Sequence, residues 1–225
     1  MSSIDYAVLR ASIVSGSTQI RVTPLDPAAI DDIAWSGGRS HLENVASQLQ
    51  RVDTGEVEYL AVRADGHAVS KGGIDFAKES DAGTIWQVAT HPQLEGIGLA
   101  TLLIHALESR ALERGVSRIR LGVELDNGRA RRLYEHLGYR VIGESETSWE
   151  AETADGSRFL HTTTLAEMLK VVERIPSHPP IGPGRYASVR DQPSEQGPRD
   201  RRSPSRGSPV LGGDGSAPSA GAWKR

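Results

Sequence analysis

The stretch from Thr84 to Arg114 limits the folds that this chain can adopt. It opens with a predicted strand, Thr84–Thr90, which His91-Pro92 ends because proline has no amide hydrogen to donate to a sheet. A glycine loop, Gly96-Ile97-Gly98, then leads into a predicted helix that runs to Arg114. A strand joined through a glycine loop to a helix is typical of mixed α/β folds, and the free amides at the helix N-terminus favour an anionic ligand.

The predicted helix Leu99–Arg114 is amphipathic, and Gly115 supplies the left-handed residue that ends it. Five apolar side chains share one of its faces: Leu99, Leu102, Leu103, Ala106 and Leu107. Around this helix the chain alternates between strands and helices, which predicts a mixed sheet flanked by helices. The other predicted strands are 20–22, 56–63, 67–75, 117–124, 140–149 and 158–165, and the other predicted helices are 26–35, 41–51 and 128–137.

Residues 176–225 have a different composition. Half of this segment is proline, glycine or serine, so it cannot bury enough apolar surface to offset its ordering entropy, and we predict a disordered tail. The tail carries eight basic and four acidic residues, a net charge of +4, which leaves −7 for residues 1–175. So acidic a domain is poorly suited to a nucleic-acid backbone and better suited to a cationic acceptor, although plain solubility explains the charge as well.

The composition excludes several other classes of protein. The chain has no cysteine, which rules out disulfides, cysteine metal ligands and a cysteine nucleophile, and no metal site is expected. It has neither an apolar run of membrane-spanning length nor a secretory signal at Met1, so we expect a cytoplasmic protein that does not engage a membrane.

A second motif runs from Asn127 to Tyr139 and reads Asn-Gly-Arg-Ala-Arg-Arg-Leu-Tyr-Glu-His-Leu-Gly-Tyr. Together with the glycine loop it resembles the GNAT superfamily of N-acetyltransferases, whose motif is Asn-x-x-Ala-x-x-Leu-Tyr-Glu-x-Leu-Gly-Phe/Tyr. The match covers Thr84–Tyr139, and the flanking strands extend it over residues 18–170. The resemblance implies a central mixed, mostly antiparallel sheet flanked by about four helices, with acetyl-CoA as co-substrate.

The resemblance also implies the residues that bind acetyl-CoA. They come from the end of a strand, the glycine loop and the second motif: Val88, Ala89, Thr90, Glu95, Gly96, Ile97, Gly98, Leu99, Ala100, Thr101, Asn127, Ala130 and Tyr134. The strand should bulge or splay from strand 117–124, so that the amides of Val88 and Thr90 hold the pantetheine and polarise the thioester carbonyl. Glu95 occupies a position where the family has arginine or glutamine. If the family pattern Arg/Gln-x-x-Gly-x-Gly is matched without keeping the loop length, the loop starts at Gln93 instead.

Amide formation from a thioester needs a neutral amine and a departing thiolate. Tyr134 follows Ala130 by one helical turn and, on this resemblance, protonates the thiolate. Ribosomal-protein acetyltransferases of this family have a glutamate base at the position of Gly122, which this chain lacks. The nearest candidate base is therefore the carboxylate of Glu124. Glu58 and a relay of water molecules are the alternatives. Without a cysteine, we expect direct transfer in a ternary complex.

The predicted acceptor is a primary amine, of either a small molecule or a protein, because GNAT acceptors include polyamines, aminoglycoside-like antibiotics and protein amines. A non-catalytic acyl-CoA-binding protein of the same fold is the main alternative. A Rossmann-type nucleotide binder would need its glycine loop after the first strand, and a nucleic-acid module acting through the basic tail would need interleaved aromatic residues. A homodimer is left open.

Overall fold

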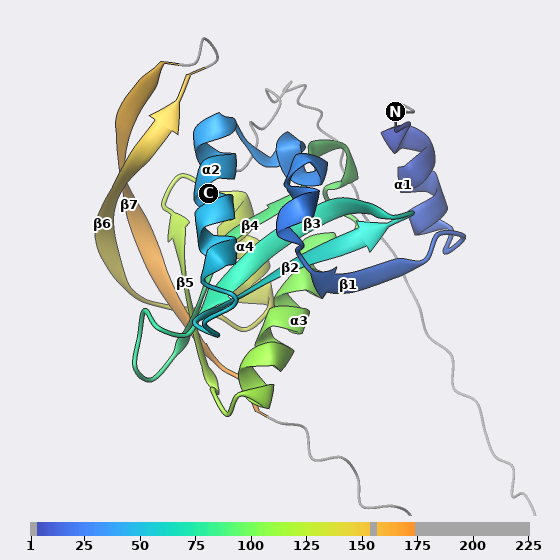
Figure 1. Cartoon of the computed structure of the whole chain (residues 1–225). Coiled ribbons are helices and arrows are strands. Elements are labelled where there is room, and N and C mark those ends of the chain that lie inside the picture. Colours follow the sequence, from blue (N-terminus) through green and yellow to red (C-terminus); the bar gives the residue numbers. More distant parts are fainter. Residues whose placement is uncertain (1–3, 154–156, 174–225) are drawn as a thin grey trace, which may run out of the picture. The chain divides into compact units, whose positions relative to one another are not determined.

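The structure is a computed structural model that describes residues 4–153 and 157–173. The seven strands of the described residues form one sheet in the order β1-β2-β3-β4-β5-β7-β6 (Figure 1). Neighbouring strands are antiparallel except β4 and β5, which are parallel, so the prediction of a mixed, mostly antiparallel sheet is confirmed. The strands are β1 (Ile20–Pro24), β2 (Val57–Ala64), β3 (His67–Asp75), β4 (Gly83–Thr90), β5 (Arg118–Glu124), β6 (Arg140–Glu152) and β7 (Arg158–Val171).

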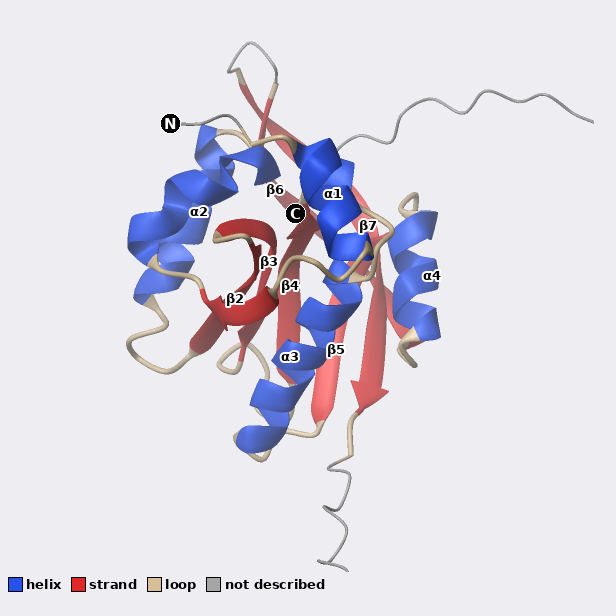
Figure 2. Ribbon diagram, turned by 90° about the vertical axis from the view of Figure 1, so that its right-hand side faces the viewer, coloured by secondary structure: helices blue, strands red, loops and turns tan. Residues whose placement is uncertain are grey.

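Helices cover both faces of the sheet (Figure 2). Helices α1, α3 and α4 pack against the larger apolar core on one face, whereas α2 and the 3-10 helix η1 pack against a smaller core on the other. The helices are α1 (Tyr6–Val14), η1 (Pro27–Ser36), α2 (Arg39–Gln50), η2 (Pro92–Leu94), α3 (Leu99–Glu113) and α4 (Gly128–His136).

Two helical predictions need correction. No element was predicted before Ile20, but α1 forms there, capped by Asp5, whose carboxylate accepts hydrogen bonds from the amides of Ala7 and Val8. Segment 26–35 was predicted as a regular helix, yet η1 is a 3-10 helix with non-helical backbone angles at Ala29. Such short, tight turns give poorer hydrogen bonds than an α-helix does, and they serve here as a connector onto the sheet.

Helix α3 confirms the prediction of an amphipathic helix after the glycine loop, with one error in its apolar face. Leu99, Leu103 and Leu107 are buried as predicted, but Leu102 is 40% exposed, and the stripe continues through Ile104 and Ala111 instead. The stripe therefore follows the i, i+4 and i+5 positions from Leu99, and Leu102 projects from its edge.

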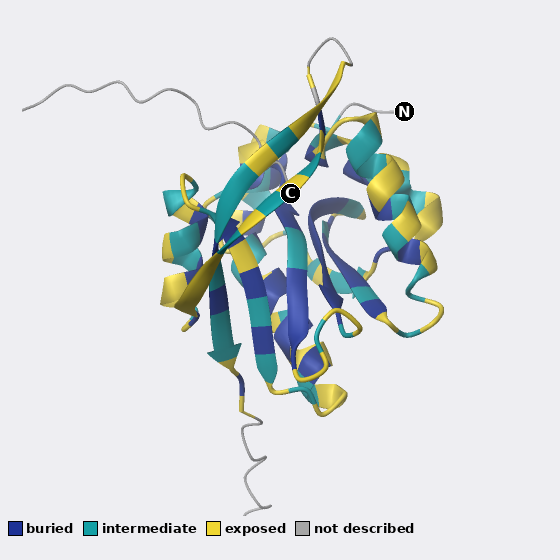
Figure 3. Ribbon diagram, turned by 90° about the vertical axis from the view of Figure 1, so that its left-hand side faces the viewer, coloured by how far each residue is buried: buried dark blue, intermediate teal, exposed yellow. Residues whose placement is uncertain are grey.

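The hairpin of β6 and β7 is longer than predicted. These strands were expected to end at Trp149 and Leu165, but their pairing runs from Arg140 opposite Leu169 to Glu152 opposite Arg158. Figure 3 shows that the outer part of this hairpin is exposed, whereas the central strands are mostly buried. The missed end of β6 lies in this exposed outer part, where no continuous buried face gives a periodic pattern. The missed end of β7 pairs with β5 and buries Ala166 and Met168, so its alternation was overlooked.

The predicted disordered tail, residues 176–225, lies outside the described residues. Of the helices within the described ranges, none has both the length and the apolar character to cross a membrane.

Lys71 of β3 is a fully buried lysine close to the centre of the sheet. Its Nζ lies 2.9 Å from Nε2 of His41 and donates a hydrogen bond of 3.1 Å to the hydroxyl of Tyr59. Burial lowers the pKa of Lys71 from its ordinary value near 10.5 to about 7, because no carboxylate of the described residues forms an ion pair with it to offset desolvation.

This pKa predicts how stability depends on pH. Between about pH 7 and 10.5 the unfolded chain binds a proton at Lys71 that the folded chain has lost, so the free energy of unfolding rises with pH by up to ~1.4 kcal/mol per unit. In Lys71→Met that contribution is absent. Urea unfolding at pH 7 and 9.5 should therefore show a smaller increase for Lys71→Met than for the wild type. The exposed Lys78→Met is the control, and parallel pH profiles for wild type and Lys71→Met would contradict the prediction.

Candidate active site

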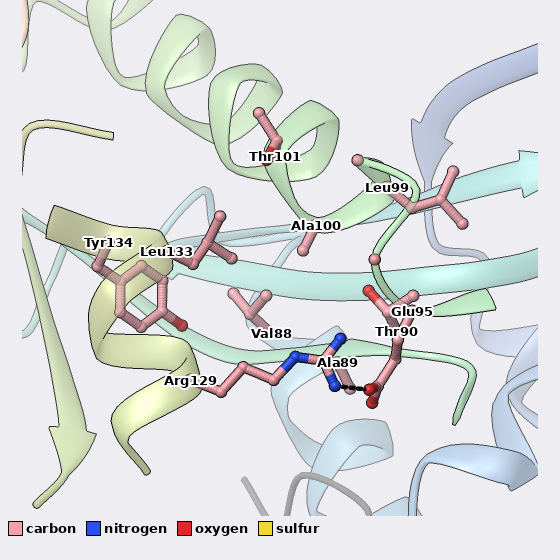
Figure 4. A pocket seen from close by; sticks show the side chains of 12 residues that line it. Val88, Ala89, Thr90, Glu95, Leu99, Ala100, Thr101, Arg129, Leu133 and Tyr134 are labelled. Atoms are coloured by element: carbon pink, nitrogen blue, oxygen red, sulfur yellow. Dashed lines mark hydrogen bonds and ion pairs between the residues drawn. The ribbon is translucent and has the colours of Figure 1, made fainter. Parts of the chain in front are cut away.

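A cavity of about 330 Å³ lies between β4, the loop before α3, and α4, and is named here the α3 cavity (Figure 4). The end of β4 and the loop that follows it meet α4, which is distant in sequence, and ten of the predicted binding residues line the cavity. The lining consists of Val88, Ala89, Thr90, Glu95, Gly96, Gly98, Leu99, Ala100, Thr101, Arg129, Leu133 and Tyr134.

The cavity opens where β4 separates from β5. The two strands pair only from Gly83 to Ile85, opposite residues 119–121, so β4 has no strand partner among the described residues on that side from Trp86 onward. Gln87 has a left-handed backbone (φ +51°), and the pairing of β4 with β3 shifts register beside it. The predicted bulge and splay are therefore confirmed, and the β5-facing edge of β4 is open to a ligand.

Gly72 of β3 allows this bulge to form. A Cβ atom at Gly72 would lie 3.1 Å from Val88 Cγ2 and 3.2 Å from Val88 Cα, tighter than ordinary packing. The absence of a side chain at Gly72 therefore allows this close approach, and a larger residue would require Val88 to shift.

The two glycines of the loop before α3 present backbone rather than side chains to the cavity. Gly96 (φ +80°) and Gly98 (φ +88°) both have left-handed backbones, and Gly98 precedes α3 without any side-chain cap. A Cβ at Gly98 would meet no atom within 4 Å, so glycine is required there by the backbone angle, and the space beside it is open. The amides of the first turn of α3 and the positive end of its dipole thus face a space suited to an anion.

Two contacts hold this loop in place from outside the cavity. Arg10 of α1 donates hydrogen bonds to the carbonyl oxygens of Gln93 (3.0 Å) and Glu95 (2.9 Å), and the side chain of Leu94 is fully buried. Helix α1, which was not predicted from the sequence, therefore fixes the loop that forms one side of the cavity.

Tyr134 of α4 forms the opposite end of the cavity. Its side chain is 6% exposed, its ring packs edge-on against Tyr139 at a centroid distance of 6.0 Å, and Figure 4 shows its hydroxyl pointing into the cavity. Burial raises the pKa of Tyr134 well above its ordinary value of 10. The hydroxyl therefore keeps its proton throughout the neutral range and is present as a hydrogen-bond donor.

Three predicted binding residues do not line the cavity. The side chain of Asn127 caps α4 by accepting a hydrogen bond of 3.1 Å from the amide of Ala130. Ala130 is itself a residue of α4 and is fully buried. Ile97 packs against the larger core from the loop. These residues position α4 and the loop rather than forming the wall of the cavity.

Two lining residues, Arg129 and Leu133, were not predicted from the sequence. Leu133 is part of the Leu-Tyr pair in the second motif and directly precedes Tyr134. Arg129 is a cation in the first turn of α4, where the helix dipole disfavours positive charge. This unfavourable position is the sequence signal that could have identified Arg129 as a binding residue. Its guanidinium forms an ion pair with Glu95 across the cavity (Figure 4).

The two carboxylates considered as bases lie in different places. Glu58 pairs with Arg114 (2.8 Å) and Arg110 (3.5 Å) at the far end of α3, away from the cavity. Glu124 is the last residue of β5, and its buried Oε1 lies 3.3 Å from Nε2 of His161 without forming an aligned hydrogen bond to any described residue. Of the two, only Glu124 therefore has a carboxylate oxygen that is close to the splay and not engaged by an arginine.

A second cavity, also of about 330 Å³, lies on the other face of the sheet and is named the α2 cavity. It contacts β4 up to Gln87, and the α3 cavity begins at the next residue, Val88. Glu124 does not line the α2 cavity, but its register partner on β7, Leu165, does. The α2 cavity is lined by Asn44, Gln48, Arg51, Asp75, Lys78, Thr84, Ile85, Trp86, Gln87, Gly122, Thr147, Trp149 and Leu165.

The α2 cavity is lined by three charged side chains, the carboxylate of Asp75 and the cations Arg51 and Lys78. Burial favours the neutral form of Asp75, but hydrogen bonds from Arg51 (2.7 Å) and from the amides of Ala77 and Lys78 outweigh it and lower the pKa of Asp75. Two indole rings, Trp86 and Trp149, add aromatic surface that suits a cation or an apolar group. No group of three or more His, Asp or Glu side chains in the described ranges is arranged to hold a metal ion.

Comparison with known proteins gives a consistent result. The sequence model of the acetyltransferase (GNAT) family matches residues 28–139, a range that includes both motifs. Among solved structures, the ribosomal-protein-S18-alanine N-acetyltransferase from Escherichia coli is 18% identical, with a TM-score of 0.54, covering 71% of this chain and 98% of that one.

Two further structures share the fold. One is yncA from Salmonella typhimurium with its cofactor acetyl-CoA, at 18% identity and a TM-score of 0.53, covering 69% of this chain and 95% of that one. The other is the spermidine/spermine N-acetyltransferase SpeG from Vibrio cholerae, at 15% identity and a TM-score of 0.53, covering 72% and 94%. At these identities the similarity establishes the fold alone.

Proposed function

Because this chain belongs to the acetyltransferase (GNAT) family, we propose that it moves an acetyl group from acetyl-CoA directly to a primary amine in a ternary complex. One observation carries this proposal: a single cavity joins an uncapped helix N-terminus to a buried tyrosine hydroxyl, along the unpaired edge of β4. An anionic cofactor with a thioester at its far end requires these features in this order.

The binding residues act through backbone and shape. The amides at the start of α3 receive the pyrophosphate, and the edge of β4 from Val88 to Thr90 binds the pantetheine and polarises the thioester carbonyl. Ala89 and Ala100 keep the walls of the cavity low on either side. We assign acetyl-CoA the role of co-substrate.

The second cavity supports direct transfer. The acceptor approaches from the α2 cavity, which borders β4 at Gln87, the residue before the α3 cavity begins. The amine nitrogen then attacks the thioester carbonyl carbon, a C–N bond forms, and the C–S bond breaks. No acyl-enzyme is needed, and the chain has no cysteine that could form one.

Two protons must move. An amine with a pKa near 10.4 is neutral in only about one molecule in a thousand at pH 7, so a base is required. Glu124, close to His161 and paired in register with Leu165 of the α2 cavity, accepts the amine proton either directly or through water. Tyr134 gives its proton to the departing sulfur, and the products are an N-acetylated amine and coenzyme A.

The acceptor is a small-molecule or protein amine. The structural relatives named above include an N-acetyltransferase of a ribosomal protein and one of spermidine and spermine, so the shared fold accommodates both kinds of acceptor. The charge of −7 on residues 1–175 favours a cationic acceptor in this chain.

Release of coenzyme A across a panel of amines tests the proposed function. The panel contains polyamines, an aminoglycoside, lysine-containing peptides and peptides with free N-termini. We expect thiol release with at least one class and an acetylated product by mass spectrometry. Glu124→Gln should lower kcat by roughly a hundredfold while leaving acetyl-CoA affinity unchanged.

Two outcomes would count against these assignments. Acetyl-CoA binding without turnover of any amine would favour the non-catalytic acyl-CoA-binding protein. An unchanged kcat in Glu124→Gln would remove Glu124 as the base and leave the water relay.

A further inference from the structure

Glu95 and Arg129 are the two charged side chains among the described residues that line the α3 cavity. Glu95 belongs to the loop before α3 and Arg129 to the first turn of α4, and their ion pair connects these two elements across the cavity (Figure 4). The Glu95 side chain is 18% exposed and that of Arg129 is 51% exposed. A carboxylate is thus held, partly buried, within a cavity that is otherwise suited to an anion.

We propose that Glu95 is a built-in competitor for the phosphate groups of coenzyme A, which take Arg129 from it when they bind. This inference rests on the proposed function, because it assumes that acetyl-CoA binds in the α3 cavity. It adds that the ion pair sets the affinity of the site and makes that affinity depend on the ligand's phosphates.

The chemistry of arginine supports an exchange of partners. Its planar guanidinium binds carboxylate and phosphate oxygens with the same forked geometry, so either anion satisfies it. A cation in the first turn of α4 is disfavoured by the helix dipole and needs an anion nearby. Arg129 is therefore positioned to hold one anion at a time, either Glu95 or a ligand phosphate.

The position of Glu95 makes the exchange costly in the wild type. Once Arg129 turns to a phosphate, the carboxylate remains partly buried and close to a second negative group. Among the described side chains that line the cavity there is no other cation to neutralise it. Glu95 therefore weakens binding of a phosphate-bearing ligand and has no such effect on a thioester without phosphates.

Binding of two ligands to two single variants tests this proposal. Titration calorimetry measures the Kd of acetyl-CoA and of acetyl-pantetheine, which carries the same thioester but no phosphate. Glu95→Gln should bind acetyl-CoA about tenfold more tightly than the wild type, because one repulsive interaction is removed, and should bind acetyl-pantetheine as the wild type does. Arg129→Gln should bind acetyl-CoA at least about tenfold more weakly, since it loses the cation and leaves Glu95 unpaired.

The double variant and a control complete the experiment. Glu95→Gln combined with Arg129→Gln should recover part of the affinity lost in Arg129→Gln alone, because the unpaired carboxylate is gone. Glu135→Gln is the matched control: it removes the carboxylate of another α4 ion pair, Arg131–Glu135 at 3.0 Å, whose residues lie outside the α3 cavity. It should leave both Kd values unchanged.

Several results would overturn the proposal. Weaker or unchanged acetyl-CoA binding in Glu95→Gln would show that the pair braces the loop and does not compete with the ligand. An equal gain for acetyl-pantetheine would show that the phosphates are not involved. Failure of the proposed function has a different signature, because in that case neither the wild type nor Glu95→Gln binds acetyl-CoA at all.

Discussion

Tyr134→Phe is expected to lower kcat by roughly ten- to ten-thousandfold, the range usual for loss of one general acid, while the Kd of acetyl-CoA stays close to that of the wild type. The substitution removes the hydroxyl that points into the α3 cavity and keeps the ring that packs against Tyr139. Because burial keeps Tyr134 protonated, its titration should add no alkaline limb to the pH–rate profile below about pH 10. Single-turnover kinetics of acetyl transfer measure the chemical step.

Two further variants separate catalysis from packing. Tyr139→Phe removes the neighbouring hydroxyl, which donates to Glu108 in the core and not into the cavity, so it should reduce stability and leave kcat unchanged. Tyr134→Ala leaves a void and should also weaken acetyl-CoA binding and reduce stability by about 3–5 kcal/mol. If Tyr134→Phe turns over at the wild-type rate where chemistry is limiting, Tyr134 is an aromatic wall and not the acid.

Gly98→Asp is expected to abolish acetyl-CoA binding. The backbone at Gly98 is left-handed, which costs a residue with a side chain roughly 1 kcal/mol or more, and the new carboxylate would lie at the N-terminus of α3 where the pyrophosphate binds. Repulsion between the two anions adds to this strain. Titration calorimetry with acetyl-CoA should detect no saturable binding.

The chain provides a matched control for this substitution. Gly115, at the other end of α3, has φ +80°, and a Cβ atom added there, as at Gly98, would meet no atom within 4 Å. Gly115→Asp therefore imposes the same backbone strain away from the cavity and should keep the wild-type Kd. Equal binding by wild type and Gly98→Asp would show that the anion site is not at this loop.

The parts of the fold that local patterns determine were predicted from the sequence. The glycine loop, the helix that follows it and the motif around Tyr134 each combine a turn residue with helical periodicity, and the structure brings them into one cavity. The splay of β4 was also expected. Helix α1 was missed although Asp5 is a local cap signal and Leu9 and Ile13 lie one turn apart, because this nine-residue pattern is short and its burial depends on distant elements.

Features that depend on pairs of distant residues were not predictable. The Glu95–Arg129 ion pair joins positions on two different elements, and only the folded chain brings them together. A lysine in a strand suggests an exposed position. Lys71 of β3 nevertheless packs beneath His41 and Tyr59 and is completely buried. In both cases tertiary packing determines the electrostatics, so the sequence alone does not show which groups come into contact.

Titration of the wild-type protein with acetyl-CoA tests the central claim most directly, because every assigned role depends on that ligand lying in the α3 cavity. The account predicts saturable binding of one acetyl-CoA per chain, lost in Gly98→Asp and retained in Gly115→Asp. No binding by the wild type, or binding that Gly98→Asp leaves intact, would contradict it.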